Sequence, residues 1–133
     1  MHLKYSKKLL EHFRNPHNVG KVKNADVVVQ EGSPACGDML ELSLKVDKKT
    51  KKIKDIKFKS YGCAANIATV SIMTDMLKGK TIKQAEKFDW KDIGKALKGI
   101  PLVKVHCSIL AVKALKKAIE NYKEMKKWTT NRS

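Results

Sequence analysis

Three cysteines and two of their near neighbours are the residues of this chain best suited to bind a metal. Cys36 is separated from Asp38 by one glycine, and His106 immediately precedes Cys107. Cys63 lies between these two pairs, in the stretch YGCAAN. Three thiolates with one oxygen or nitrogen ligand form a tetrahedral set. Such a set suits Zn²⁺, Fe²⁺ or an iron–sulfur cluster with one non-thiolate ligand.

Each cysteine could also have a role that involves no metal. An odd number of cysteines leaves one thiol over in a disulfide framework, and buried cysteines can act as small hydrophobic residues. Cys63 stands where a strand gives way to a helix. The helix N-terminus would stabilise its thiolate, or the cysteine would only fill a tight turn. Neighbouring residues on a helix point about 100° apart, so we expect no protease-like pairing of His106 with Cys107.

The strand that follows Cys36 predicts where Asp38 points. Its apolar residues alternate on one face, which comprises Leu40, Leu42, Leu44 and Val46. Asp38 shares this inward face, and so does Cys36 if the chain stays extended through Gly37. An inward carboxylate is costly unless a metal ion, a lysine or a helix N-terminus compensates it. The short spacing can therefore aim a thiol and a carboxylate at one place.

The remaining periodicity predicts the elements that position these groups. A helix is expected near Ser6 to Arg14, with an apolar stripe of Leu9, Leu10 and Phe13. Three strands are expected, over 25–32, 38–47 and 53–61, the last two joined by a hairpin turn. A helix over 63–78 is apolar almost all round, with Gly79 as its stop.

Two short helices and one long helix are expected to complete the chain. The short helices are predicted over 81–88 and 89–99 and the long one from about Val105 to Lys127. The predicted apolar stripe of the long helix is Ile109, Val112, Leu115, Ile119 and Tyr122. Strands followed by helices predict an α+β fold. In it, a three-stranded antiparallel meander has one face covered by helices and the other exposed.

Length and composition limit the class of protein. The 133 residues suit one domain over residues 1–133. The most apolar run, between Ala64 and Leu77, is too short and too polar to cross a membrane. The N-terminus lacks the apolar core and cleavage site of a signal peptide. We therefore expect a cytoplasmic protein without a membrane segment.

The net charge of +16 at first suggests nucleic-acid binding. Of the 29 basic residues, however, only Arg14 and Arg132 are arginines, the residue that base readout favours. The sequence also shows no aromatic platform for stacking bases. We expect no nucleic-acid partner. A lysine-rich surface would instead attract an acidic protein.

The cysteine motifs resemble those of the IscU/NifU-type iron–sulfur cluster assembly scaffolds, and in particular the IscU branch. The matching stretches are YSKKLLEHFRNPHNVG, GSPACGDMLEL, FKSYGCAANIATVSIMTDMLKGKT and VKVHCSILAVKALKKAI. The resemblance implies a SufE/NifU-like fold with a long C-terminal helix. It also implies assembly of [2Fe–2S] clusters from Fe²⁺ and persulfide sulfur, followed by transfer to recipient apo-proteins. The protein would be a scaffold and not a conventional enzyme.

The resemblance also implies roles for individual residues. Cys36, Cys63 and Cys107 would ligate the cluster, and Asp38 or His106 would complete the set. Cys107 would accept persulfide sulfur from a cysteine desulfurase. Asp38 would take part in assembly and keep the cluster labile.

Further partners and residues follow from the same resemblance. Tyr5 matches a tyrosine linked to self-association, and Lys104 would tune the site. The implied partners include an electron donor such as a ferredoxin, and a cluster-bound homodimer would shield an exposed cluster. Leu102 replaces the second proline of the segment that a dedicated Hsp70-type chaperone reads, which counts against that step. Ala64 and Ala65 follow Cys63 where the family often has Gly-Ser.

Other functions stay open at the level of sequence. A zinc-dependent sulfur-relay protein of the SufU type would use the same ligands. A structural zinc domain would unfold on chelation, and a basic nucleic-acid module would bind in a salt-sensitive way without its cysteines.

Overall fold

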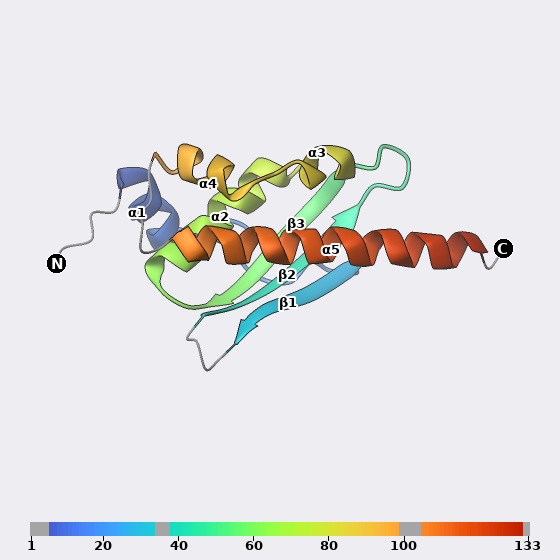
Figure 1. Ribbon diagram of the computed structural model, residues 1–133, viewed down its shortest axis with the longest axis horizontal. Coiled ribbons are helices and arrows are strands. Elements are labelled where there is room, and N and C mark those ends of the chain that lie inside the picture. Colours follow the sequence, from blue (N-terminus) through green and yellow to red (C-terminus); the bar gives the residue numbers. More distant parts are fainter. Residues whose placement is uncertain (1–5, 34–37, 99–104, 132–133) are drawn as a thin grey trace.

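The computed structural model describes residues 6–33, 38–98 and 105–131. One helix comes first, the three strands follow it consecutively, and the other helices follow the strands (Figure 1). In chain order they are α1 (Lys7–Arg14), β1 (Val27–Ser33), β2 (Asp38–Val46), β3 (Ile53–Tyr61), α2 (Ala64–Leu77), α3 (Ile82–Glu86), α4 (Trp90–Ala96) and α5 (Val105–Asn131).

The three strands form an antiparallel sheet in the order β1-β2-β3. Leu42 at the centre of β2 pairs with Val29 of β1 and with Phe58 of β3. All three of these side chains are buried. The predicted meander is therefore confirmed, as is the turn that joins β2 to β3.

Helices α2 and α5 cover the inner face of the sheet. Both helices contribute to one buried cluster with the strands, and α2 packs on β3 while α5 packs on β1 and β2. In Figure 1, α5 runs across the sheet and its first turn lies beside the start of α2. The α+β arrangement predicted from the sequence is confirmed.

The outer face of the sheet is less exposed than predicted. Ser43 of β2 alternates with the inward-facing leucines and was therefore expected on the exposed face, but it is only 1% exposed. Its hydroxyl accepts a hydrogen bond of 2.9 Å from the backbone N–H of Val22, which is itself buried. The cause is the segment after α1, which runs along β3. The Gly20 N–H donates to the Phe58 carbonyl at 2.8 Å, and the Phe58 N–H donates to the Asn18 carbonyl at 2.9 Å.

The buried stripe of α5 also differs from the prediction. Ile109, placed in the stripe, is 45% exposed. Leu115, Ile119 and Tyr122 of the stripe are buried as predicted, and the small residues Ala111, Ala114 and Ala118 face the core beside them. The helix also continues to Asn131, beyond the predicted end at Lys127.

The ends of the helices agree with the predicted start and stop signals. The Ser6 hydroxyl caps α1 by accepting from the Leu9 N–H at 3.0 Å. Phe13 of the predicted α1 stripe is 41% exposed, whereas Leu9 is fully buried. Gly79, just after α2, has a φ of +87°, a conformation that favours glycine.

Within the described residues, no helix is long and apolar enough to cross a membrane.

Leu42→Ala should lower the free energy of unfolding by about 2–5 kcal/mol, because it empties a site at the centre of the core. Urea denaturation measures this change. Val28→Ala is the matched control, since Val28 lies on the outer face of β1 and is 40% exposed. It should change stability by less than about 0.5 kcal/mol. Equal losses in the two variants would contradict the assignment of the inner face.

Candidate metal site

Cys63 lies at the junction between β3 and α2. It is the N-cap residue of α2 and has an extended backbone, with φ −77° and ψ 172°. Its side chain makes no capping hydrogen bond, so the half-buried sulfur is not used to satisfy the helix. The unpaired amides at a helix N-terminus favour negative charge nearby. This position therefore places a potential metal-ligating thiol beside the N-terminus of α2.

Cys107 approaches Cys63 from the first turn of α5. It is fully buried, and its Sγ lies 3.9 Å from the Sγ of Cys63. Within the described residues, neither of these two sulfurs is in a disulfide. With bonds of about 2.3 Å, two thiolates on one tetrahedral ion are roughly 3.8 Å apart. The two sulfurs are thus already at the separation that a shared metal requires.

His106 lies against the same sulfur. Its Nε2 is 3.6 Å from the Sγ of Cys107, although the two residues are adjacent on the helix. The expectation that these side chains diverge is wrong at the level of the side-chain tips. The Cα–Cβ directions differ by about 100°, but the exposed imidazole folds back so that its distal nitrogen reaches the sulfur. The arrangement offers a third ligand or a proton carrier next to a thiolate.

The start of β2 lies at the same end of the sheet. Its first residue is Asp38, and the next, Met39, pairs with Tyr61 of β3, two residues before Cys63. The backbone that carries the carboxylate therefore begins beside the β3–α2 junction.

Several predicted site residues fall outside the described part of the chain. They are Cys36, Lys104 and Tyr5, together with the side chain of Asp38. Segment 100–104, with Leu102, also lies outside it. The structure thus brings together Cys63, Cys107 and His106.

Two exposed apolar side chains flank the thiols and were not among the predicted site residues. Tyr61 is 67% exposed and precedes Cys63 by two positions, and Ile109 is 45% exposed and follows Cys107 by two. Ile109 fits an amphipathic pattern that would bury it, whereas Tyr61 shares the outward face of β3 with Lys57 and Lys59.

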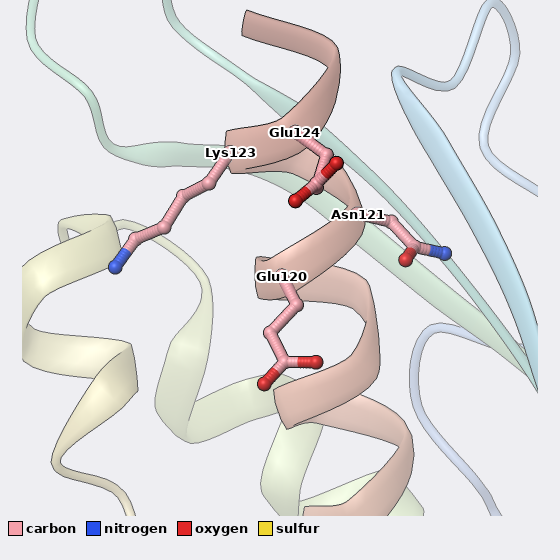
Figure 2. Close-up of a pocket in the computed structure, with 4 residues that line it drawn as sticks. All are labelled: Glu120, Asn121, Lys123 and Glu124. Carbon is pink, nitrogen blue, oxygen red and sulfur yellow. The ribbon is translucent and has the colours of Figure 1, made fainter. Parts of the chain in front are cut away.

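A hollow on the surface lies far from the thiols and carries no comparable chemistry. Figure 2 shows its lining of Glu120, Asn121, Lys123 and Glu124, all on the second half of α5. Glu120 is roughly 20 Å from Cys107 along the helix axis, at about 1.5 Å per residue. Lys123 forms an ion pair with Glu86. These four side chains are charged or polar residues of one helix face, with no thiol or imidazole among them.

Comparison with known proteins places the chain in one family. The model of the NifU-like N-terminal domain matches residues 4–129. An iron–sulfur cluster assembly scaffold protein, IscU 1 of Archaeoglobus fulgidus, is 50% identical over 118 residues, which is 89% of this chain and 76% of that protein. The IscU scaffold protein of Aquifex aeolicus is 43% identical over 122 residues, covering 92% and 78% of the two chains.

Solved structures agree with this placement. A NifU-like N-terminal domain from Brucella abortus superposes with a TM-score of 0.70 at 20% identity, over 89% of this chain and 93% of that one, and shows the fold. A SufU protein from Fervidobacterium islandicum gives a TM-score of 0.66 at 29% identity, over 86% and 96%. From the family match and the identity to its IscU members, the chain belongs to the NifU-like N-terminal domain family, with IscU-type scaffold proteins among its relatives.

Proposed function

We propose that this chain is a scaffold on which [2Fe–2S] clusters are assembled and from which they pass to apo-proteins. The observation that supports the proposal is the distance of 3.9 Å between the Cys63 and Cys107 sulfurs. One lies at the start of α2 and the other in the first turn of α5. Iron–sulfur clusters are held by thiolates, and the relatives named as cluster assembly scaffolds are up to 50% identical to this chain. The cluster is cargo, so the protein has no turnover of a small substrate.

The proposed ligand set is Cys36, Cys63 and Cys107, with Asp38 or His106 as the fourth member. His106 has the support of its 3.6 Å contact with Cys107. Asp38 has the support of its position at the start of β2, at the same end of the sheet. A carboxylate is a harder ligand than a thiolate. Ligation by Asp38 would therefore weaken the hold on the cluster and ease its release.

Cys107 is the proposed acceptor of sulfur. Its thiolate would attack the outer sulfur of a persulfide on a cysteine desulfurase, forming a persulfide on Cys107 and releasing the desulfurase thiolate. Because Cys107 is fully buried, the first turn of α5 must open for this exchange. Helix ends open at low cost, and the exposed His106 next to the sulfur can carry the proton.

The electron balance defines another partner. A [2Fe–2S]²⁺ cluster contains two ferric ions and two sulfides. Two Fe²⁺ ions supply two of the four electrons that reduce two sulfane sulfurs, so a donor such as a ferredoxin must supply the other two. The net charge of +16 would attract an acidic donor or desulfurase to this chain. Tyr61 and Ile109, each two positions from a thiol along the chain, are exposed and could contact these partners or a second copy in a cluster-bound homodimer.

A zinc-dependent sulfur relay of the SufU type is the second candidate. The 3.9 Å separation of the two sulfurs favours this function as well, since it is close to the spacing of two thiolates on one tetrahedral zinc ion. Metal analysis of protein purified without oxygen distinguishes the candidates only in part, because zinc can replace iron in a scaffold. Reconstitution with iron and a sulfur source must follow.

Anaerobic reconstitution with Fe²⁺, a desulfurase, cysteine and an electron donor such as reduced ferredoxin should give the visible absorption of a [2Fe–2S] cluster. Cys63→Ser and Cys107→Ser should each reduce the yield at least tenfold, because each removes a thiolate ligand. Ser108→Ala is the matched control, a buried neighbour of Cys107 outside the proposed ligand set. A wild-type protein whose thiols bind iron or zinc but that gives no [2Fe–2S] spectrum would exclude the scaffold function.

Asp38→Ala should slow assembly and lengthen the lifetime of a preformed cluster several-fold, because it removes the hard and weakly held ligand. The lifetime is read from the decay of the visible absorption in the presence of a chelator. Asp55→Asn is the control, since Asp55 pairs with Lys78 near the opposite end of the sheet. Faster cluster loss in Asp38→Ala than in this control would contradict the role given to Asp38.

A further inference from the structure

A second group of potential ligands lies away from the thiols. It consists of His12 on α1, His17 in the segment after α1, and Asp75 on α2. One ligand atom from each of the three lies within 4.8 Å of the others. Along α2, Asp75 is roughly 18 Å from the thiol end of the helix, at about 1.5 Å per residue. The group contains no cysteine, so it is separate from the proposed cluster site.

Hydrogen bonds hold the two carboxylate oxygens of Asp75. Its Oδ2 lies 2.5 Å from the Nδ1 of His17. Its Oδ1 accepts a hydrogen bond of 2.9 Å from the side-chain amide of Asn18. The carboxylate is thereby turned toward the two imidazoles. The hydrogen bond from Asn18 comes from outside the group and orients the carboxylate, as is common for metal ligands.

The ring of His12 is fixed from the opposite side. Its Nδ1 lies 2.7 Å from the Ser71 hydroxyl, which also accepts the backbone N–H of His17 at 2.8 Å. The hydrogen bond to Ser71 uses Nδ1, which leaves Nε2 as the ligand atom. The rings of His12 and His17 have centroids 4.7 Å apart, with an angle of 53° between their planes.

The burial of the three residues suits an ion that enters from solvent. His12 is 3% exposed, whereas the side chains of His17 and Asp75 are 52% and 35% exposed. One side of the group is therefore open to water, which can fill the remaining coordination positions. Burial, and then the neighbouring His17, lower the pKa of His12.

We propose that His12, His17 and Asp75 bind one divalent transition-metal ion of the Zn²⁺ or Fe²⁺ class. Two imidazoles and one carboxylate, with open positions, are a ligand set that these ions accept. With bonds of about 2.0 Å, ligand atoms on a tetrahedral ion are roughly 3.3 Å apart. The ligand atoms, which lie within 4.8 Å of one another, must therefore adjust to this separation when an ion binds. The proposal goes beyond cluster assembly, because it uses none of the cysteines.

The test uses the full chain with Cys36, Cys63 and Cys107 changed to serine. Titration calorimetry with Zn²⁺ should show one ion per chain. Co²⁺ should give a visible spectrum without thiolate charge-transfer bands. His17→Ala and Asp75→Asn should each weaken binding at least tenfold. Both changes preserve the local fold, because the backbone N–H of His17 keeps its bond to Ser71 and an asparagine can still accept from Asn18. Glu120→Gln, far along α5, is the matched control and should bind like the parent.

A second measurement covers the case in which the thiol-free chain does not fold, as judged by circular dichroism. In the wild-type protein, the imidazole ¹⁵N signals of His12 and His17 should shift on addition of Zn²⁺. The zinc content should fall by one ion per chain in His17→Ala. Unshifted signals, or binding that His17→Ala and Asp75→Asn leave unchanged, would show that the group is only a hydrogen-bond network. Failure of cluster assembly would leave this zinc binding intact, and failure here would leave assembly intact, so the two proposals are tested separately.

Discussion

The burial of one face of a three-stranded sheet determines the rest of this structure. A small sheet is stable only when its apolar face is covered, and here two helices share that face. Because α2 and α5 begin at the same end of the sheet, their first residues meet. The sulfurs of Cys63 and Cys107 lie 3.9 Å apart for this reason. The geometry of the site is a consequence of how the core is closed.

Most of the fold could be predicted from local signals. The alternation in β2, the all-round apolar character of α2 and the caps at Ser6 and Gly79 act over a few residues, and each specified its element. The first turns of α5 could not be predicted in this way. Leu115, Ile119 and Tyr122 are buried as predicted, but Ile109 lies on the outside, because its exposure depends on how the start of α5 packs against the rest of the fold. The covering of Ser43 likewise depends on the path of a distant segment.

In the site, too, some features follow from local signals and others from long-range packing. The residue types and their spacing indicated a thiolate site that includes Cys63 and Cys107, and the fold brings these two together. The contact between His106 and Cys107 depends on a side-chain rotamer, which helical geometry alone does not specify. The group of His12, His17 and Asp75 was not predicted, because α1 and α2 must pack before residues 58 positions apart can meet. No local pattern carries that information.

The segment after α1 has a further consequence for how the protein meets its own copies. A sheet edge with unpaired backbone groups invites another strand and, through it, aggregation. Residues 18–20 occupy the edge of β3 through backbone bonds to Phe58. At the other edge, Lys117 donates to the Gln30 carbonyl and lies near Glu31 of β1. The segment that carries His17 thus also keeps a neighbouring chain from adding a strand at β3. Lys117 of α5 hinders the same addition at β1.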